Sequence, residues 1–270
     1  VSEETAEEFN DVFPGNEDRV RVYYTYYNVE SINKRAKEKW DNIYEKGKIN
    51  ILAVGRFDEQ KGYDRLVEAV DLLLKKNKKI HLHILGNDKT EYGDMIKNKI
   101  KTLKIEKNIS IHGVKENPYP YIANCDLLVS SSYYEGYPRV INEALCLKKI
   151  CLGTKVTGTA GALDNGNLGI LCDDSTDGIY EGITKFLAKD KLLNKIRDDI
   201  KDFDGNKEHF FQGFLKMVND NKNILFITDI YPFNGEGFVH SEIKYMSKVF
   251  KRIDIICTNP NSKEIAYELP

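Results

Sequence analysis

The sequence predicts an α/β fold in which a parallel sheet carries helices on both faces. Short apolar runs that read as strands alternate with amphipathic stretches that read as helices. Runs such as Leu127 to Val129 are continuously apolar, as expected for strands buried on both faces. Glycine and charged residues follow several of these runs. This pattern indicates a ligand-binding edge at the carboxyl ends of the strands.

The strand and helix signals succeed one another without a break through the middle of the chain. Strands are expected near 50–55, 80–85, 109–112, 126–130, 150–153 and 169–172, and helices at 63–76, 90–104, 118–124 and 139–148. From Asp174 to Asn219 the pattern becomes wholly helical, as if to close a domain.

The two ends of the chain carry separate signals. The opening reads as a helix followed by a strand at Val20–Asn28. Asn223 begins a new strand that runs into a glycine loop, and a helix to Phe250 and a strand at Ile253–Cys257 are expected after it.

Two carboxylates flank a predicted strand-to-helix turn. Glu135 lies in the loop after the strand near 126–130, and Glu143 lies in the first turns of the helix near 139–148. Carboxylates accept hydrogen bonds from vicinal hydroxyls, and a helix N-terminus favours a phosphate. The turn therefore predicts a site for a sugar, a ribose and a phosphate together. Glu143 could instead form an ordinary helix-surface pair with Arg139.

A second cluster favours the ligand-binding interpretation. The strand near 50–55 ends at Gly55 and Arg56, and Lys61 follows shortly after. Only eight of the 40 lysine and arginine residues are arginine, so an arginine at a strand end is less expected as random surface charge. Guanidinium binds phosphate as a planar fork and lysine binds it as a point charge, which together suit a diphosphate.

Residues 48–200 resemble the C-terminal, nucleotide-sugar-binding domain of a retaining GT-B glycosyltransferase of family 4. The segments that carry the resemblance, in matching order and spacing, are Val54–Arg56 with Lys61–Gly62, Ile80–Gly86, Ile111–Gly113, Ser130–Leu145 and Gly169–Leu171. The resemblance implies a Rossmann-like sheet and a donor that is a UDP- or GDP-sugar. It also implies catalysis without a bound metal or other cofactor.

The resemblance assigns roles to individual positions. Arg56, beside Gly55, and Lys61 would hold the donor diphosphate, and Glu135 would face the donor sugar. Backbone amides of Gly136, Tyr137 and Pro138 would lie along that sugar's hydroxyls, although proline has no N–H to donate. The ribose hydroxyls would bind Glu143, the base edge would meet the backbone near Val114, and the phosphates would meet the amides of Val140 and Ile141. His112 and Gly113 would lie beside the donor, although a purely structural role for His112 is an equal alternative.

The sequence departs from the family pattern in two places. After Gly86 the family has a second glycine, whereas Asn87 follows here, which leaves base or ribose contacts at this point open. The segment Thr154–Gly161 stands where the family has a threonine followed by a glycine pair. That loop borders the donor sugar, so the identity of the sugar does not carry over.

The resemblance also predicts the domain organisation. Residues 1–45 would be the end of an acceptor-side domain and a linker, and 46–220 the nucleotide-sugar-binding domain. Residues 221–270 would begin a further Rossmann-like domain, as at the start of a second transferase. The chain would then be a window on a tandem fusion that lacks most of the acceptor-side domain. The alternative is that the two ends pack as parts of a permuted half-domain.

Composition narrows the functional classes. The net charge of −2 argues against nucleic acid as a main partner. No apolar run approaches the roughly 20 residues of a membrane helix, and no secretory signal is visible. The five cysteines lack metal-ligand spacing and suit free thiols in the cytoplasm. His81 and His83 have no ligand partners at metal spacing, so we expect core histidines and no metal site.

The function predicted is transfer of a sugar, with retention, from a nucleotide diphosphate sugar to a saccharide or lipid-linked acceptor. Bacterial surface polysaccharide synthesis is the expected context, with a cytoplasmic enzyme that meets a lipid-linked acceptor peripherally at the inner face of the membrane. Two alternatives remain open on the same fold. One is a nucleotide-sugar epimerase or a phosphorylase, and the other is a non-catalytic nucleotide-sugar-binding module.

Overall fold

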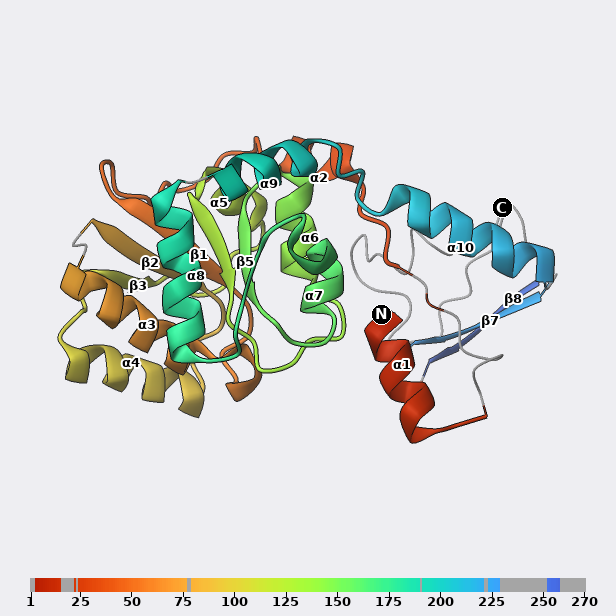
Figure 1. Ribbon diagram of the computed structural model, residues 1–270, viewed down its shortest axis with the longest axis horizontal. Helices are drawn as coiled ribbons and strands as arrows, with labels where there is room; N and C mark the ends of the chain where they lie inside the picture. The colour runs from red at the N-terminus through yellow and green to blue at the C-terminus, as the bar shows by residue number, and fades with distance from the viewer. Residues whose placement is uncertain are drawn as a thin grey trace. The chain divides into compact units, whose positions relative to one another are not determined.

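The computed structural model describes residues 3–15, 22, 24–76, 79–189, 191–220, 223–228 and 252–257. The chain forms two compact units, one of Val1–Val22 with Tyr27–Gly205 and one of Tyr23–Tyr26 with Asn206–Pro270. The first unit contains a six-stranded sheet in the order β3-β2-β1-β4-β5-β6, in which all neighbours are parallel. The predicted α/β fold is confirmed (Figure 1).

The strands lie within two residues of their predicted bounds. They are β1 (Ile49–Val54), β2 (Ile80–Leu85), β3 (Ile109–Ile111), β4 (Leu127–Ser130), β5 (Cys151–Thr154) and β6 (Ile170–Cys172). All six residues of β2 and all four of β4 are buried, which explains why these runs are continuously apolar apart from two histidines and a serine. The register pairs Ile51 of β1 with Leu82 of β2 on one side and with Leu127 of β4 on the other.

Helices cover both faces of this sheet. The crossovers that leave β1 and β4 run in opposite directions along the sheet, and right-handed crossovers then place their helices on opposite faces. On one face α3 (Tyr63–Lys76) packs against α4 (Glu91–Leu103) and α8 (Thr176–Ala188). On the other, α6 (Arg139–Cys146) packs against α5 (Tyr119–Asn124) and α2 (Val29–Arg35) (Figure 1).

The remaining elements of this unit are α1 (Glu3–Val12), η1 (Glu59–Lys61), α7 (Thr159–Ala162), η2 (Asp164–Gly166) and α9 (Lys191–Lys201). The main apolar core runs from Ile51 to Ile200 and is built from both faces of the sheet and the helices packed on them. A second small cluster joins Tyr27 and Ile32 to Cys146 at the end of α6.

The strand expected at Val20–Asn28 is wrong for the residues that are described. Residues 22 and 24–28 form no strand, whereas Val20, Arg21 and Tyr23 lie outside the described residues. The Tyr27 amide donates to the Gly205 carbonyl at 2.8 Å, in a segment whose described residues join neither sheet. An aromatic and β-branched run therefore favoured a strand that these residues do not form.

The second unit contains α10 (Lys207–Asp220) and a parallel pair of strands, β7 (Asn223–Thr228) and β8 (Arg252–Cys257). Both strands agree with the sequence prediction. The glycine loop and the helix to Phe250 lie outside the described residues.

Candidate functional site

The site forms where the strand order reverses. Strands β1 and β4 are hydrogen-bonded neighbours at the centre of the sheet, and the chain leaves them toward opposite edges. In such sheets the loops after the two central strands separate and leave a crevice at the carboxyl ends. The loop after β1 carries Arg56 and Lys61, and the loop after β4 carries Glu135.

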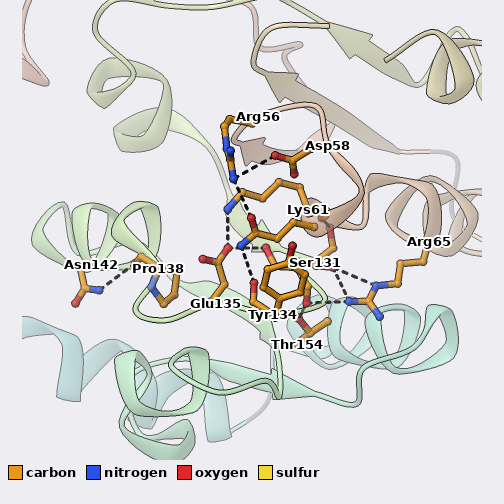
Figure 2. Close-up of polar contacts among 12 residues, drawn as sticks. Arg56, Asp58, Lys61, Arg65, Ser131, Tyr134, Glu135, Pro138, Asn142 and Thr154 are labelled. Carbon is orange, nitrogen blue, oxygen red and sulfur yellow. Dashed lines mark hydrogen bonds and ion pairs between the residues drawn. The ribbon is translucent and has the colours of Figure 1, made fainter. Parts of the chain in front are cut away.

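An ion pair joins these two loops. Lys61 Nζ lies 2.6 Å from Glu135 Oε1, and their side chains are only 20% and 11% exposed. The Ser132 hydroxyl also donates to Glu135 Oε1, at 2.7 Å (Figure 2). The ammonium has three donors, so pairing with one carboxylate oxygen leaves it able to bind a further acceptor. The structure thus brings together Lys61 and Glu135, two of the residues that the sequence singled out.

Arg56 belongs to the same group but is far more exposed. Its Nη2 donates to Gln60 Oε1 at 2.9 Å and lies 3.2 Å from Asp58 Oδ2, while 75% of its side chain is accessible. The Gln60 amide in turn donates to the Tyr134 carbonyl at 2.9 Å, so Arg56 is linked to the loop of Glu135 (Figure 2). Both contacts use one nitrogen of the guanidinium, which leaves the rest of the fork toward solvent, where an anion can approach.

Glycines follow β1, β2 and β3, and those after β1 and β2 allow close approach of neighbouring groups. A Cβ on Gly86 would lie 1.9 Å from the Gly55 carbonyl, and one on Gly55 would lie 2.9 Å from the Tyr63 hydroxyl. The Gly113 carbonyl accepts from the Gly86 amide at 3.0 Å, and Gly113 has φ +68°, a region that favours glycine. Val114, next in the chain, is 70% exposed.

The predicted phosphate amides lie at the start of α6. This helix begins at Arg139, and Pro138 precedes it. Val140 and Ile141 occupy its first turn, whose N–H groups have no acceptor within the helix itself. Ile141 is fully buried in the core, which fixes the position of this turn. Gly136 and Tyr137 complete the loop between Glu135 and the helix.

Glu143 has a different set of partners. It lies one turn further along α6, 9% exposed, with its Oε1 3.4 Å from the Tyr119 hydroxyl and 3.6 Å from Arg139 Nη2. Burial raises the pKa of Glu143, against the opposing influence of Arg139, Tyr119 and Arg35. Burial and the charge of Glu143 also raise the pKa of Tyr119 to about 12. The ion pair between Glu143 and Arg139, the alternative to a ligand role for Glu143, does form, but the distance between its charged atoms is long.

His112 is held by a row of buried histidines. His112 Nε2 lies 3.0 Å from His83 Nδ1, and the His83 ring stacks on that of His81, with centroids 4.4 Å apart. Burial lowers the pKa of His83 to about 3. His81 and His83 are core residues, as expected, and no group of three or more metal-ligating side chains occurs among the described residues.

Several residues of the site were not singled out from the sequence. Ser132 donates to Glu135, and Gln60 bridges the two loops. Arg65 is 4% exposed and donates to the carbonyls of Ser131 and Ser132. A charged residue on the first turn of an amphipathic helix gives no sign that it faces inward. The only available signal was the scarcity of arginine.

An α/β domain whose central strand ends gather cations, a carboxylate and a helix start has the layout of a nucleotide-binding domain. The family model for glycosyl transferases group 1 matches residues 34–203, and the chain belongs to this family. This span contains the six strands and every residue of the site.

Individual relatives agree with the family. The chain is 29% identical over 192 residues to an N-acetylgalactosamine-N,N'-diacetylbacillosaminyl-diphospho-undecaprenol 4-alpha-N-acetylgalactosaminyltransferase of Campylobacter jejuni, which covers 69% of the chain and 50% of that protein. It is 24% identical to a poly(ribitol-phosphate) alpha-N-acetylglucosaminyltransferase of Staphylococcus aureus, over 54% of the chain and 31% of the relative. The chain thus spans half or less of the length of these curated relatives.

Solved structures share the fold. A glycosyltransferase from Rickettsia africae superposes with a TM-score of 0.68 at 18% identity, over 82% of this chain and 61% of that one. Anabaena Alr3699/HepE, solved in complex with UDP and glucose, gives a TM-score of 0.68 at 16% identity, over 82% and 62%. At these identities the likeness establishes the fold alone.

Proposed function

We propose that the chain binds the nucleotide-sugar donor in a transferase that moves the sugar to an acceptor hydroxyl with retention, as in glycosyltransferase family 4. The observation that carries the proposal is the Lys61–Glu135 pair, which connects the two loops at the point where the strand order reverses. The Ser132 hydroxyl also binds Glu135, and Gln60 makes a second link between the same loops. A lysine already beside a carboxylate at a partly buried position can hold a diphosphate next to a sugar.

The charges of the site suit the chemistry of this transfer. When the bond from the sugar to the diphosphate breaks, negative charge develops on the leaving phosphate. Lys61, the open side of the Arg56 fork and the first turn of α6 would stabilise that charge without a bound metal. Because these groups are already fixed in the folded protein, little reorganisation is needed as the charge develops.

We assign each contact of the donor to a residue of the candidate site. The sugar would lie against Glu135 and the loop of Gly136, Tyr137 and Pro138. The ribose hydroxyls would donate to Glu143, which also accepts a hydrogen bond from the Tyr119 hydroxyl. The base edge would meet the backbone at Val114, close to Gly113 and His112.

The names of the relatives support the choice of acceptor and context. The Campylobacter relative is a transferase of N-acetylgalactosamine to an undecaprenol-linked diphosphosugar, and a lipopolysaccharide core glycosyltransferase of Rhizobium meliloti is a further match. We therefore propose a saccharide or lipid-linked acceptor in bacterial surface polysaccharide synthesis. For the donor we propose a UDP-sugar in preference to a GDP-sugar, because Anabaena Alr3699/HepE, which shares the fold, was solved in complex with UDP and glucose. No helix among the described residues has the length and apolar character to cross a membrane. A cytoplasmic enzyme that visits the inner face of the membrane suits such an acceptor.

The domain organisation is part of the proposal. An acceptor-side domain, to which residues 1–45 would belong in part, is needed to complete the cleft, and residues 221–270 begin a further Rossmann-like domain. The parallel pair of β7 and β8 supports the second point, since parallel strands need a crossover connection of the kind such domains contain.

Calorimetry with UDP, GDP and a panel of their sugars tests the proposal on this chain. We expect binding of at least one UDP-sugar, and weaker binding in Lys61→Ala. Arg197→Ala, which changes an exposed arginine on α9, is the control. Absence of binding to every nucleotide sugar would overturn the proposal. Analysis of the product with a labelled donor and an acceptor separates transfer from epimerisation, and the anomeric configuration of that product tests retention.

A further inference from the structure

Arg65 occupies an unusual position for a charged residue. It lies in the first turn of α3 and is 4% exposed. Its guanidinium forms an ion pair with Asp174, whose side chain is 40% exposed, and lies 3.7 Å from the centre of the Tyr133 ring. Burying a cation costs free energy unless its N–H groups are hydrogen-bonded or paired with an anion. The acceptors around Arg65 therefore indicate why the residue is buried.

The principal partners are two carbonyls of the loop after β4. Arg65 Nε and Nη2 donate to the Ser131 carbonyl at 3.1 and 2.7 Å, and Nη2 donates to the Ser132 carbonyl at 2.8 Å (Figure 2). These residues come directly after the last residue of β4, where the strand ladder no longer supplies donors. The Thr154 hydroxyl adds a second bond to the Ser132 carbonyl, at 2.6 Å.

The same two serines hold the predicted donor site. The Ser131 hydroxyl donates to the Lys61 carbonyl at 2.8 Å, and the Ser132 hydroxyl donates to Glu135 Oε1 at 2.7 Å. The two residues therefore have their carbonyls on Arg65 and their hydroxyls on the two members of the ion pair. A shift of this segment would move both Lys61 and Glu135.

Gly62 leaves the space that this arrangement needs. It has φ +59°, and a Cβ there would lie 2.3 Å from the Ser131 carbonyl and 2.9 Å from Arg65 Nε. A side chain at this position would separate the guanidinium from the carbonyl that it binds. The glycine in the turn before α3 thus allows the Arg65 guanidinium to reach the Ser131 carbonyl in the loop after β4.

We propose that Arg65 is a positioning residue for donor binding, which sets the separation of Lys61 and Glu135 through the carbonyls of Ser131 and Ser132. The proposal rests on the proposed function for its ligand, and on the contacts alone for its geometry. A lysine cannot replace the fork, because one ammonium would have to reach two carbonyls and Asp174 from a single point.

The test compares Arg65→Lys with the wild-type chain and with Arg197→Lys, an exposed arginine on α9, as the control. Hydrogen exchange is measured for peptides covering 131–137 and, as a reference, 80–85. Calorimetry measures binding of UDP and of UDP-N-acetylglucosamine. The ratio of the two dissociation constants isolates the contribution of the sugar, which Glu135 would contact.

Arg65→Lys is expected to speed exchange at least tenfold in 131–137 but not in 80–85. It should also reduce the sugar's contribution to affinity at least fivefold, while the affinity for UDP changes less than threefold. Exchange at 131–137 equal to wild type, or exchange raised uniformly with the melting temperature lowered in parallel, would overturn the proposal. Should Arg65→Lys fail to fold, Asp174→Asn replaces it and is judged by the same two measurements.

These readouts keep the two proposals separate. A wild-type chain that binds neither UDP nor UDP-N-acetylglucosamine argues against the proposed function with this donor, and exchange in 131–137 still decides the role of Arg65. A wild-type chain that binds the sugar nucleotide, with Arg65→Lys unchanged in exchange and in the ratio, retains the function and rejects the positioning role.

Discussion

Lys61 and Glu135 are shielded from water far more than Arg56, and this difference separates their roles. Exposed ion pairs contribute about 0–1 kcal/mol to stability, whereas removal of one partner from a buried pair leaves an uncompensated charge. Arg56 is therefore the variant that tests chemistry with the least disturbance of folding. Lys61 tests chemistry and local packing together.

Arg56→Ala is expected to lower turnover by about 10²–10³, the loss typical of a removed electrostatic donor, with little change in melting temperature. Lys61→Ala should lower turnover at least as much, with a larger but still secondary effect on stability. Both are measured as initial rates in an enzyme complete with its acceptor-side domain, with Arg197→Ala as the control. Unchanged turnover in both variants would contradict the site assignment.

Glu143 makes the stability of the protein depend on pH in a predictable direction. Its pKa is raised in the folded state, so the native protein holds this proton more tightly than the unfolded chain does. The free energy of unfolding should therefore fall as pH rises from the ordinary glutamate pKa through the raised one. Glu143→Gln removes the titrating group and with it this pH-dependent contribution. The free energy of unfolding of the variant should therefore equal that of wild type at about pH 3 and exceed it at about pH 7.

Two measurements check Glu143. Denaturant unfolding at several pH values should show the difference between wild type and Glu143→Gln growing with pH, and a constant difference would contradict the sign. The same substitution should weaken nucleotide binding, although it stabilises the fold. Loss of the carboxylate that accepts the ribose hydroxyls should weaken UDP affinity about tenfold at neutral pH, on the scale of one charge-assisted hydrogen bond.

At the level of elements, the sequence predicted strand bounds well because buried parallel strands are continuously apolar. The helices after β1 and β4 were equally clear, since glycine or proline precedes each of them. For the described residues of Val20–Asn28 the predicted strand was wrong, because residue preference alone does not provide a partner strand. In the candidate site, Lys61 and Glu135 of the predicted residues form a pair, and Gln60 links Arg56 to the loop of Glu135. The contacts of Arg65 and Ser132 were not predictable, because they depend on the path of the folded loops.

The loop after β5 belongs to the site through a single glycine. Gly158 has φ +76°, and a Cβ there would lie 2.1 Å from the Gly136 carbonyl and 2.7 Å from the Glu135 carbonyl. Gly158→Ala should therefore push the Glu135 loop away from Lys61. We expect at least tenfold weaker binding of a UDP-sugar and a loss of stability of about 1–3 kcal/mol.

Gly166→Ala is a matched control for this prediction. Gly166 also has a positive φ, +101°, but the nearest atom to an added Cβ there is 4.0 Å away. It should share the backbone strain without displacing the Glu135 loop. Equal loss of UDP-sugar affinity in both variants would show that contact with the Glu135 loop is not the cause.

On the scale of the whole molecule, the proposed donor site lies within one unit. The main core and every predicted site residue fall between Ile51 and Ile200, inside Tyr27–Gly205. A fragment of residues 27–205 should therefore unfold cooperatively and bind a UDP-sugar within about threefold of the intact chain. Circular dichroism and calorimetry check this. A fragment that is unfolded, or more than tenfold weaker in binding, would show that the site depends on the rest of the chain.

The Lys61–Glu135 contact joins residues 74 positions apart, through loops that leave two adjacent strands. During synthesis on the ribosome the pair cannot exist until the fourth strand has emerged and docked beside the first. A donor that recognises this pair binds only the assembled sheet, and so shifts the equilibrium away from unfolded chains by mass action. The cell's supply of nucleotide sugar would then also govern how long the protein survives proteolysis.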